Sequence, residues 1–242
     1  MTPALEAKAL SKSFHTEGKT IDVLKSVSLS IPAGAFHAVM GPSGSGKSTL
    51  LNLLAGLLPA DSGEVCVDGQ ALTGLSDRDL TLLRRRTVGI IFQDFNLIPT
   101  LTVSENIALP ALLDGNPLPQ EQLDKLLTLV GLSHRAHQPA EKLSGGEAQR
   151  TAIARAFAMH PRIILADEPT GNLDTTAATT FCETLKRLNA ELGIAILLIS
   201  HDPQVAAAAE TVHLLKDGEI CASFASEQSA ATVAQRYLEC MA

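Results

Sequence analysis

The sequence lacks the features that would direct a protein to nucleic acid or into a membrane. It has no basic run longer than Arg84-Arg85-Arg86, and its formal net charge is −7. Because proteins that mainly bind nucleic acid usually carry a basic face, we expect no nucleic-acid partner. The longest apolar runs, such as residues 194–199, have the length of a strand and are far too short to cross a bilayer. We therefore expect no direct membrane insertion.

Cysteine is scarce, and residues 1–10 do not read as a signal peptide. The four cysteines form no CxxC pair; they are Cys66, Cys182, Cys221 and Cys240. His134 and His137 form an H-x-x-H pattern without a further ligand pair nearby, which favours a solvated loop over a metal site. The N-terminus lacks the basic start and long apolar core of a signal peptide. We therefore expect reduced thiols in a cytoplasmic protein.

The sequence does contain the apolar pattern of an α/β domain. At 242 residues and 45% hydrophobic, the chain can bury a sizeable core. Strands are expected at 23–31, 36–40, 64–67, 88–92, 163–166, 194–199, 212–215 and 219–224, and helices after residue 48 and at 77–86, 103–113, 121–130, 145–159 and 174–192. Continuous apolar runs indicate parallel strands covered on both faces. We expect one domain over 1–242, with a core at about 1–93 and 158–242 and a helical insertion at about 94–157.

A glycine-rich segment between a predicted strand and a predicted helix matches the phosphate-binding loop, G-x-x-x-x-G-K-[ST]. Glycines let backbone N–H groups turn inward around phosphate oxygens, and the helix adds the positive end of its dipole. The residues expected at this site are Gly41, Pro42, Ser43, Gly44, Ser45, Gly46, Lys47, Ser48 and Thr49. Lys47 would reach the β- and γ-phosphates, and Ser48 would ligate Mg²⁺. The alternative, a Gly/Ser-rich linker, does not explain the flanking strand and helix.

Two adjacent carboxylates follow the predicted strand 163–166. Side chains alternate across a strand, so Asp167 and Glu168 can take separate duties. Asp167 would hold Mg²⁺ through water, because this ion keeps much of its hydration shell. Glu168 would polarise the attacking water as a general base. A solvated loop running into Pro169 is the alternative, and the phosphate loop upstream argues against it.

A double glycine precedes the predicted helix 145–159, in Leu143-Ser144-Gly145-Gly146-Glu147. Ser144 and Glu147 have the spacing of a capping box, so a well-capped helix is the simpler interpretation. Gly145 and Gly146 indicate more, because they bare backbone N–H groups at a helix N-terminus, where an anion can bind.

Together these motifs resemble the nucleotide-binding domain of the ATP-binding cassette (ABC) family, of which LSGGE is the signature. The resemblance covers essentially the whole chain, with the motifs in the family's order and spacing. It implies a P-loop NTPase core with a parallel sheet, an antiparallel β subdomain and an inserted helical subdomain. It also implies a transport-coupled ATPase with ATP and Mg²⁺ as cofactors.

The resemblance implies roles for four further residues. Phe14 occupies the place of an aromatic residue, often tyrosine, that stacks on adenine. Gln93 matches the Q-loop glutamine, which contacts Mg²⁺ and the attacking water. Asp174, in Gly171-Asn172-Leu173-Asp174, matches the D-loop, although Gly-Asn replaces the Ser-Ala of many members. His201 matches the switch histidine that holds the γ-phosphate; the alternative is an ordinary surface histidine after a strand.

The resemblance also implies two protein partners. In this family Ser144 and Gly146 serve the ATP bound by the opposite subunit, so a second copy completes each site. An integral membrane permease would hold the chain on the cytoplasmic face of the inner (plasma) membrane. The apolar residues Phe95, Leu97, Ile98 and Leu101 would line the groove that receives a permease helix, unless they fill the core of the helical insertion.

Two stretches, 95–106 and 167–174, resemble ATPases of the lipoprotein-release and macrolide-efflux type. Those ATPases work with permeases that have few membrane helices and large periplasmic domains. Amino-acid-importer ATPases and cell-division ATPases share parts of both stretches, so an importer subunit and a cell-division scaffold remain alternatives. Other non-transport members carry two cassettes or a long coiled coil, whereas this chain has one cassette and about a hundred ordinary residues between phosphate loop and signature.

Overall fold

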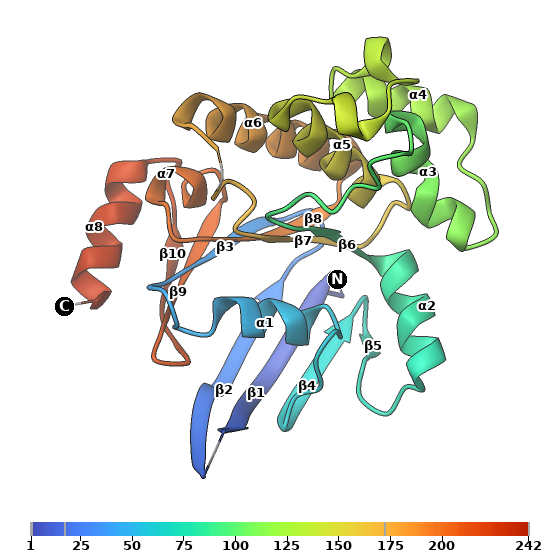
Figure 1. Ribbon diagram of the computed structural model, residues 1–242. Helices are drawn as coiled ribbons and strands as arrows, with labels where there is room; N and C mark the ends of the chain where they lie inside the picture. Colours follow the sequence, from blue (N-terminus) through green and yellow to red (C-terminus); the bar gives the residue numbers. More distant parts are fainter. Residues whose placement is uncertain (1, 17, 172, 242) are drawn as a thin grey trace.

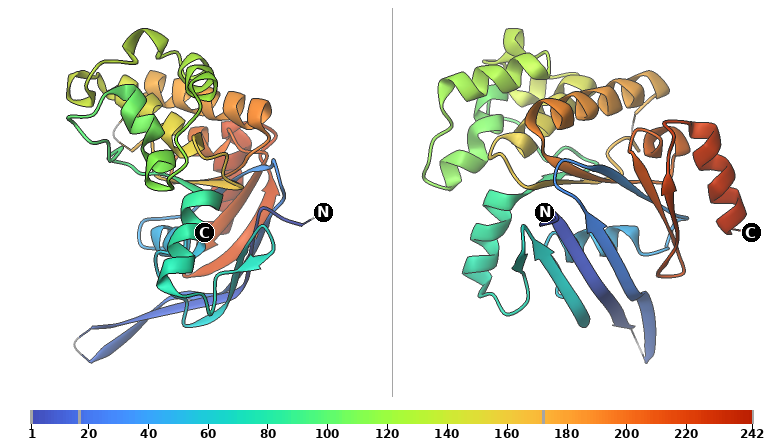
Figure 2. Two further views of the ribbon diagram at one scale, coloured as in Figure 1. Left: turned by 90° about the vertical axis from the view of Figure 1, so that its right-hand side faces the viewer. Right: turned by 180° about the vertical axis from the view of Figure 1, so that it is seen from behind.

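Two β-sheets form the framework of the molecule (Figure 1). The computed structural model describes residues 2–16, 18–171 and 173–241. The strands are β1 (Leu5–Thr16), β2 (Lys19–Ile31), β3 (Phe36–Met40), β4 (Ser62–Val67), β5 (Gln70–Ala71), β6 (Val88–Ile91), β7 (Ile163–Asp167), β8 (Ala195–Ser200), β9 (Thr211–Lys216) and β10 (Glu219–Ala225). The larger sheet has the order β10-β9-β3-β8-β7-β6 and is parallel except for β10. The smaller sheet, β2-β1-β4-β5, is antiparallel, and its β1–β2 ribbon projects away from the body (Figure 2).

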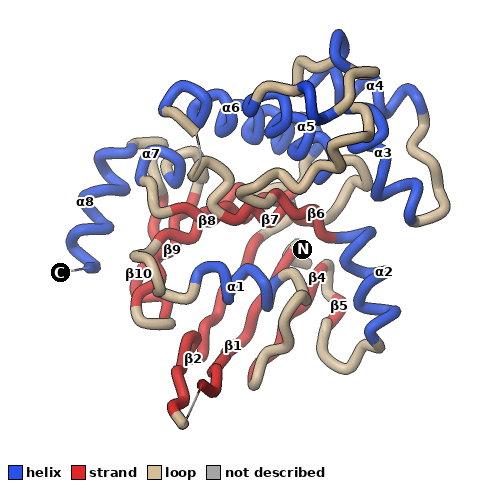
Figure 3. The backbone as a smooth tube through the Cα atoms, in the orientation of Figure 1, coloured by secondary structure: helices blue, strands red, loops and turns tan. Residues whose placement is uncertain are grey.

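Most helices gather on one face of the larger sheet (Figure 3). The helices are α1 (Lys47–Leu54), α2 (Asp77–Thr87), α3 (Val103–Leu113), α4 (Gln120–Leu129), α5 (Gly145–Phe157), α6 (Thr175–Leu192), α7 (Pro203–Ala206) and α8 (Ala230–Met241). Helices α3 to α6 cover that face, whereas α1 lies on the other side and contacts β2, β7 and β8. Among the residues described, no helix combines the length and the apolar character needed to cross a bilayer.

Alternating strand residues divide the interior into two cores. In β8, Ile196 and Leu198 pack with the helices α3 to α6, whereas Leu197 and Ile199 pack with α1 and the smaller sheet. All four side chains are fully buried. A strand covered on both faces must be apolar at every position, which explains the continuous apolar runs. The mixed α/β architecture with a parallel sheet, an antiparallel sheet and a set of inserted helices is as the sequence predicted.

Among the strands and α-helices of the described residues, four were not predicted: β1, β5, α7 and α8. The pairing of β1 with β2 shifts register three times, and Ala9 has a φ of +49°. Such irregularities break the alternation by which a strand is recognised in a sequence. Elements β5 and α7 span only two and four residues, which is too short to show a period.

The end of the C-terminal helix lies against the edge strand of the larger sheet. Cys221 in β10 and Cys240 in α8 are neighbours there, with their Cα atoms 7.0 Å apart. The expectation of reduced thiols stays a prediction, and Cys66 and Cys182 are free. The spacing of the four cysteines gave no sign of this pair, because the fold alone brings the end of α8 back to β10.

Two buried histidines meet between β3 and β9. His37 Nδ1 lies 3.0 Å from His213 Nε2, and His213 Nδ1 lies 2.7 Å from Ser223 Oγ. Burial lowers the pKa of His37 and lowers that of His213 to about 4, because a charged ring is poorly solvated there. The folded chain therefore holds His213 neutral down to a pH at which a solvated histidine is already charged.

We expect the free energy of unfolding to fall as the pH drops from about 6.5 to about 4. In this window the unfolded chain binds more protons at position 213 than the folded chain does. The stability due to the neutral ring is complete above the window and is lost across it, by roughly 3 kcal/mol at most. In urea denaturation, the free energy of unfolding of His213→Gln should depend less on pH than that of the wild type. The control His134→Gln, at an exposed site, should keep the wild-type pH dependence. Equal acid dependence in all three proteins would assign the effect to other groups.

Candidate functional site

The predicted phosphate loop connects β3 to α1. Gly46 precedes the helix with a φ of +102°, and a Cβ at this position would lie 2.8 Å from the carbonyl oxygen of Val23. Only glycine fits both the left-handed backbone and the close approach of β2. No side chain caps α1, so the N–H groups of its first turn are free for another acceptor.

A phosphate group fits this loop. Ser45 Oγ is buried and has no hydrogen-bond partner within the described part of the chain. A buried hydroxyl without a partner is costly, and phosphate oxygens are strong acceptors. The uncapped helix start and the Ser45 hydroxyl therefore provide what an anion needs.

Lys47 is held inside the loop. Its Nζ donates to the carbonyl oxygens of Gly41 and Pro42, each at 3.0 Å, and lies 3.6 Å from Glu168 Oε1. The side chain is only 5% exposed. The side chain is buried because the loop's own carbonyls fold around the ammonium group. These contacts place a positive charge beside the loop's N–H groups.

Asp167 and Ser48 face each other at the carboxyl end of β7. Ser48 Oγ donates to Asp167 Oδ1 at 3.3 Å. Burial raises the pKa of Asp167, and the neighbouring Glu168 carboxylate raises it further, while the bond from Ser48 opposes both. A cation here would relieve the buried negative charge. One carboxylate and one hydroxyl also suit Mg²⁺, which binds few protein ligands and completes its shell with water and phosphates.

The Glu168 carboxylate lies between two cationic or protonatable groups. Its Oε2 is 3.0 Å from His201 Nδ1, and its Oε1 is 3.6 Å from Lys47 Nζ. Glu168 has a φ of +41°, a left-handed conformation that is rare for a non-glycine residue. Strain of this kind clusters at functional sites, where the surroundings enforce it. The turn after β7 therefore directs this carboxylate toward the phosphate loop.

Gln93 lies beside the loop that follows Glu168. A Cβ at Gly171 would lie 2.9 Å from Gln93 Nε2, so the glycine leaves room for the amide. Asp174, the last residue of the predicted D-loop, caps α6 by accepting a bond from Ala177 N at 2.8 Å. Asn172 lies outside the described residues.

Phe14 lies on β1 with 40% of its surface exposed. Lys12 Nζ is 5.7 Å from the centre of its ring. Asp61 fixes this part of the strand by accepting bonds from Lys12 Nζ at 2.6 Å and from Ser13 N at 2.7 Å. An open aromatic face on an anchored strand is suited to stacking on a planar base.

The LSGGE segment forms the capped start of α5. Ser144 and Glu147 make a complete capping box. Hydrogen bonds from Ser144 lower the pKa of Glu147 to about 2. A Cβ at Gly145 would meet no atom within 4 Å, so packing within this chain does not demand a glycine there. The open face at Gly145 is therefore available to a molecule from outside the chain.

The sequence pattern of the family described as "ABC transporter" matches residues 24–171. The chain belongs to this family. ABC relatives include the lipoprotein-releasing system ATP-binding protein LolD 1 of Rhodopirellula baltica, which is 45% identical over 204 residues, covering 84% of this chain and 89% of that protein. The macrolide export ATP-binding/permease protein MacB of Bdellovibrio bacteriovorus is 39% identical over 216 residues, covering 89% of this chain and 33% of the longer protein.

The fold agrees with solved ABC cassettes. A dimeric structure of a post-hydrolysis state of the cassette MJ0796, bound to ADP and Pi, superposes with a TM-score of 0.82 at 39% identity. The match covers 92% of this chain and 99% of the MJ0796 chain. The chain is therefore an ATP-binding and ATP-hydrolysing cassette of an ABC transporter.

The ABC chain brings most of the predicted site residues together, but not the signature. Lys47, Ser48, Asp167, Glu168 and His201 are linked by the contacts described above. Within the described residues, no hydrogen bond or ion pair joins Ser144, Gly145 or Gly146 to the phosphate loop. The α1 helix after the loop and the α5 helix after Ser144 lie on opposite sides of the larger sheet (Figure 1).

An arginine that no sequence motif marked supports the backbone beside the ABC Q-loop. Arg155 in α5 donates to the carbonyl oxygens of Phe95 and Asn96, at 2.7 and 2.5 Å. Both residues have positive φ, of +59° and +49°, so the guanidinium group fixes an otherwise unfavourable turn. An arginine within a helical pattern reads as a surface residue, and no motif marked it.

Proposed function

We propose that two copies of this chain close around ATP and Mg²⁺ and thereby drive a separate membrane permease. The observation that carries this proposal is the division of the site. The phosphate loop, both carboxylates and His201 converge in one chain, whereas the signature at the start of α5 lies apart with Gly145 open. A second copy would supply the missing half. The dimeric state of the MJ0796 cassette supports this arrangement.

The chain's own residues would divide the reaction as follows. Lys47 and the loop N–H groups hold the phosphates, and Ser48, Asp167 and Gln93 hold Mg²⁺. Bound Mg²⁺ supplies positive charge against the charge that develops on the phosphates. Glu168 accepts a proton from the attacking water, and His201, 3.0 Å from that carboxylate, holds the γ-phosphate side of the site. Phe14 stacks on adenine, and Ser144, Gly145, Gly146 and Asp174 act across the dimer.

The permease would be of the lipoprotein-release or macrolide-efflux type, as the two relatives' names indicate for those proteins. It would hold the chain on the cytoplasmic face of the inner (plasma) membrane. We propose that residues 94–157 form the helical subdomain that meets it. Phe95, Leu97, Ile98 and Leu101 belong to neither buried core, and Ile98 is 40% exposed. This supports docking by the four side chains over the alternative that they fill the subdomain.

Purification of the tagged chain from detergent-solubilised membranes tests this function. We expect a permease with few membrane helices and a large extracytoplasmic domain to co-purify. Ile98→Glu should abolish co-purification and leave Tm and ATP binding of the isolated chain unchanged, because a charge on an exposed apolar contact opposes docking but not folding. Leu57→Glu is the matched control, since Leu57 is exposed at 47% on another part of the surface.

Two outcomes would contradict parts of this proposal. A lower Tm for Ile98→Glu would assign the side chain to the core of the subdomain. Co-purification of an importer permease or of cell-division proteins would replace the proposed partner by one of the two alternatives.

A further inference from the structure

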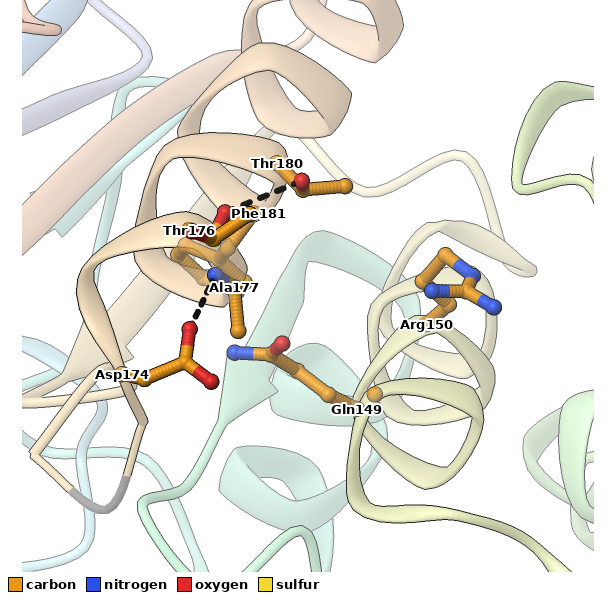
Figure 4. A pocket seen from close by; sticks show the side chains of 8 residues that line it. Gln149, Arg150, Asp174, Thr176, Ala177, Thr180 and Phe181 are labelled. Atoms are coloured by element: carbon orange, nitrogen blue, oxygen red, sulfur yellow. Dashed lines mark hydrogen bonds between the residues drawn. The ribbon is translucent and has the colours of Figure 1, made fainter.

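A buried glutamine connects the signature helix to the catalytic turn. Gln149, in the second turn of α5, is only 3% exposed, and its Nε2 donates to the carbonyl oxygen of Pro169 at 3.1 Å. Pro169 directly follows Glu168. Figure 4 shows the Gln149 side chain extending from α5 toward Asp174 and the first turn of α6, whereas Arg150 points elsewhere. Gln149, Arg150 and Asp174 are among the residues that line a small pocket, of about 210 Å³, between α5 and α6.

Few backbone hydrogen bonds tie the turn that Gln149 reaches to the rest of the described chain. Among the described backbone hydrogen bonds of residues 168–171 and 173, only Glu168 N bonds to another element, donating to Ile199 O at 3.0 Å. The bonds from Gly171 N to Glu168 O and from Leu173 N to Thr170 O remain within the turn. Because Glu168 has a φ of +41°, the turn needs outside support to keep its shape.

We propose that Gln149 is a positioning residue for ATP hydrolysis. Its amide holds the turn that presents the Glu168 carboxylate, and it makes this turn follow the movements of α5. The proposal rests on the proposed role of Glu168 as the general base. Since α5 begins at the signature, which would bind the partner subunit's ATP, the Gln149 bond connects that nucleotide to this chain's own carboxylate. A misplaced carboxylate lowers the rate steeply without lowering nucleotide affinity.

The test compares Gln149→Met with Gln122→Met. Methionine keeps the size of the side chain but removes the N–H donor. Gln122 is a matched control, because its Nε2 donates to the Ala158 carbonyl at the other end of α5, at 2.9 Å. We expect Gln149→Met to lower kcat at least about tenfold, with an unchanged Kd for ATP and a reduced Hill coefficient. Gln122→Met should keep the wild-type kcat, although its Tm should be similar to that of Gln149→Met. Gln149→Asn retains the amide but shortens its reach. This variant should reproduce the loss of kcat while lowering Tm less than Gln149→Met does.

A double-mutant cycle separates positioning from a general structural role. In single-turnover assays, adding Gln149→Met to Glu168→Gln should cause little further loss, because the carboxylate that Gln149 positions is already gone. A full multiplicative loss, a wild-type kcat for Gln149→Met, or an equal loss for Gln122→Met would overturn the inference. If Glu168→Gln alone kept the wild-type rate, the proposed base would fail, and that result is distinct from the outcomes for Gln149.

Discussion

Glu168→Gln should bind ATP as the wild type does and hydrolyse it about 10²- to 10⁴-fold more slowly. Glutamine is nearly isosteric, so the turn after β7 and the contacts of Asp167 with Ser48 should survive. An amide cannot accept a proton as the carboxylate does, although it occupies the same place beside His201 and Lys47. Single-turnover hydrolysis and equilibrium nucleotide binding measure the two effects separately.

The same variant should reveal the dimer. If hydrolysis fails while binding persists, ATP remains between the phosphate loop of one subunit and Ser144 and Gly146 of the other. Size-exclusion chromatography should then show a dimer with ATP and Mg²⁺ and a monomer with ADP. Glu191→Gln, an exposed change on α6, is the control and should behave as the wild type. A wild-type rate for Glu168→Gln would exclude Glu168 as the base, and a monomer at saturating ATP would contradict closure of the isolated chain.

Lys47→Met and Lys47→Ala should each lower ATP hydrolysis by about 10- to 10²-fold, because a charge-assisted phosphate contact of roughly 1.5–3 kcal/mol is lost. The two variants should differ in stability. Lys47 is buried, so alanine leaves an unfilled space, whereas methionine retains most of the side-chain stem. We therefore expect a lower Tm for alanine than for methionine at similar catalytic loss.

Isothermal titration with ATP, steady-state ATPase assays and thermal unfolding check this prediction. Lys142→Met, an exposed change before the signature, serves as the control. A wild-type rate in either Lys47 variant would contradict the assignment of the phosphate loop. A loss of activity that followed Tm alone would attribute the effect to unfolding.

Local sequence patterns were sufficient to predict most of the elements that carry the site, although not β1, on which Phe14 lies. Helix α3 has the predicted bounds, Val103–Leu113, because Thr102 and Glu105 form a capping box at its start. Strands β7 and β8 lie where continuous apolar runs predicted them, since both of their faces are covered. The spacing of Gly41, Lys47 and Ser48 likewise indicated a strand, a loop and a helix in that order. These are short-range consequences of capping, periodicity and backbone freedom.

Only the tertiary structure decided how distant segments meet. It buried Lys47 among loop carbonyls, brought Cys240 back to Cys221, and placed Gln149 against Pro169 across a separation of 20 residues. Such contacts depend on how helices pack on the sheet, and that packing has no period in the sequence. The sequence alone therefore predicted the chemistry that we propose, ATP bound by a phosphate loop beside two carboxylates, because that chemistry needs particular residues at fixed spacing. The fold decided which backbone groups hold those residues in place, because any residue of suitable size and polarity can fill such a position.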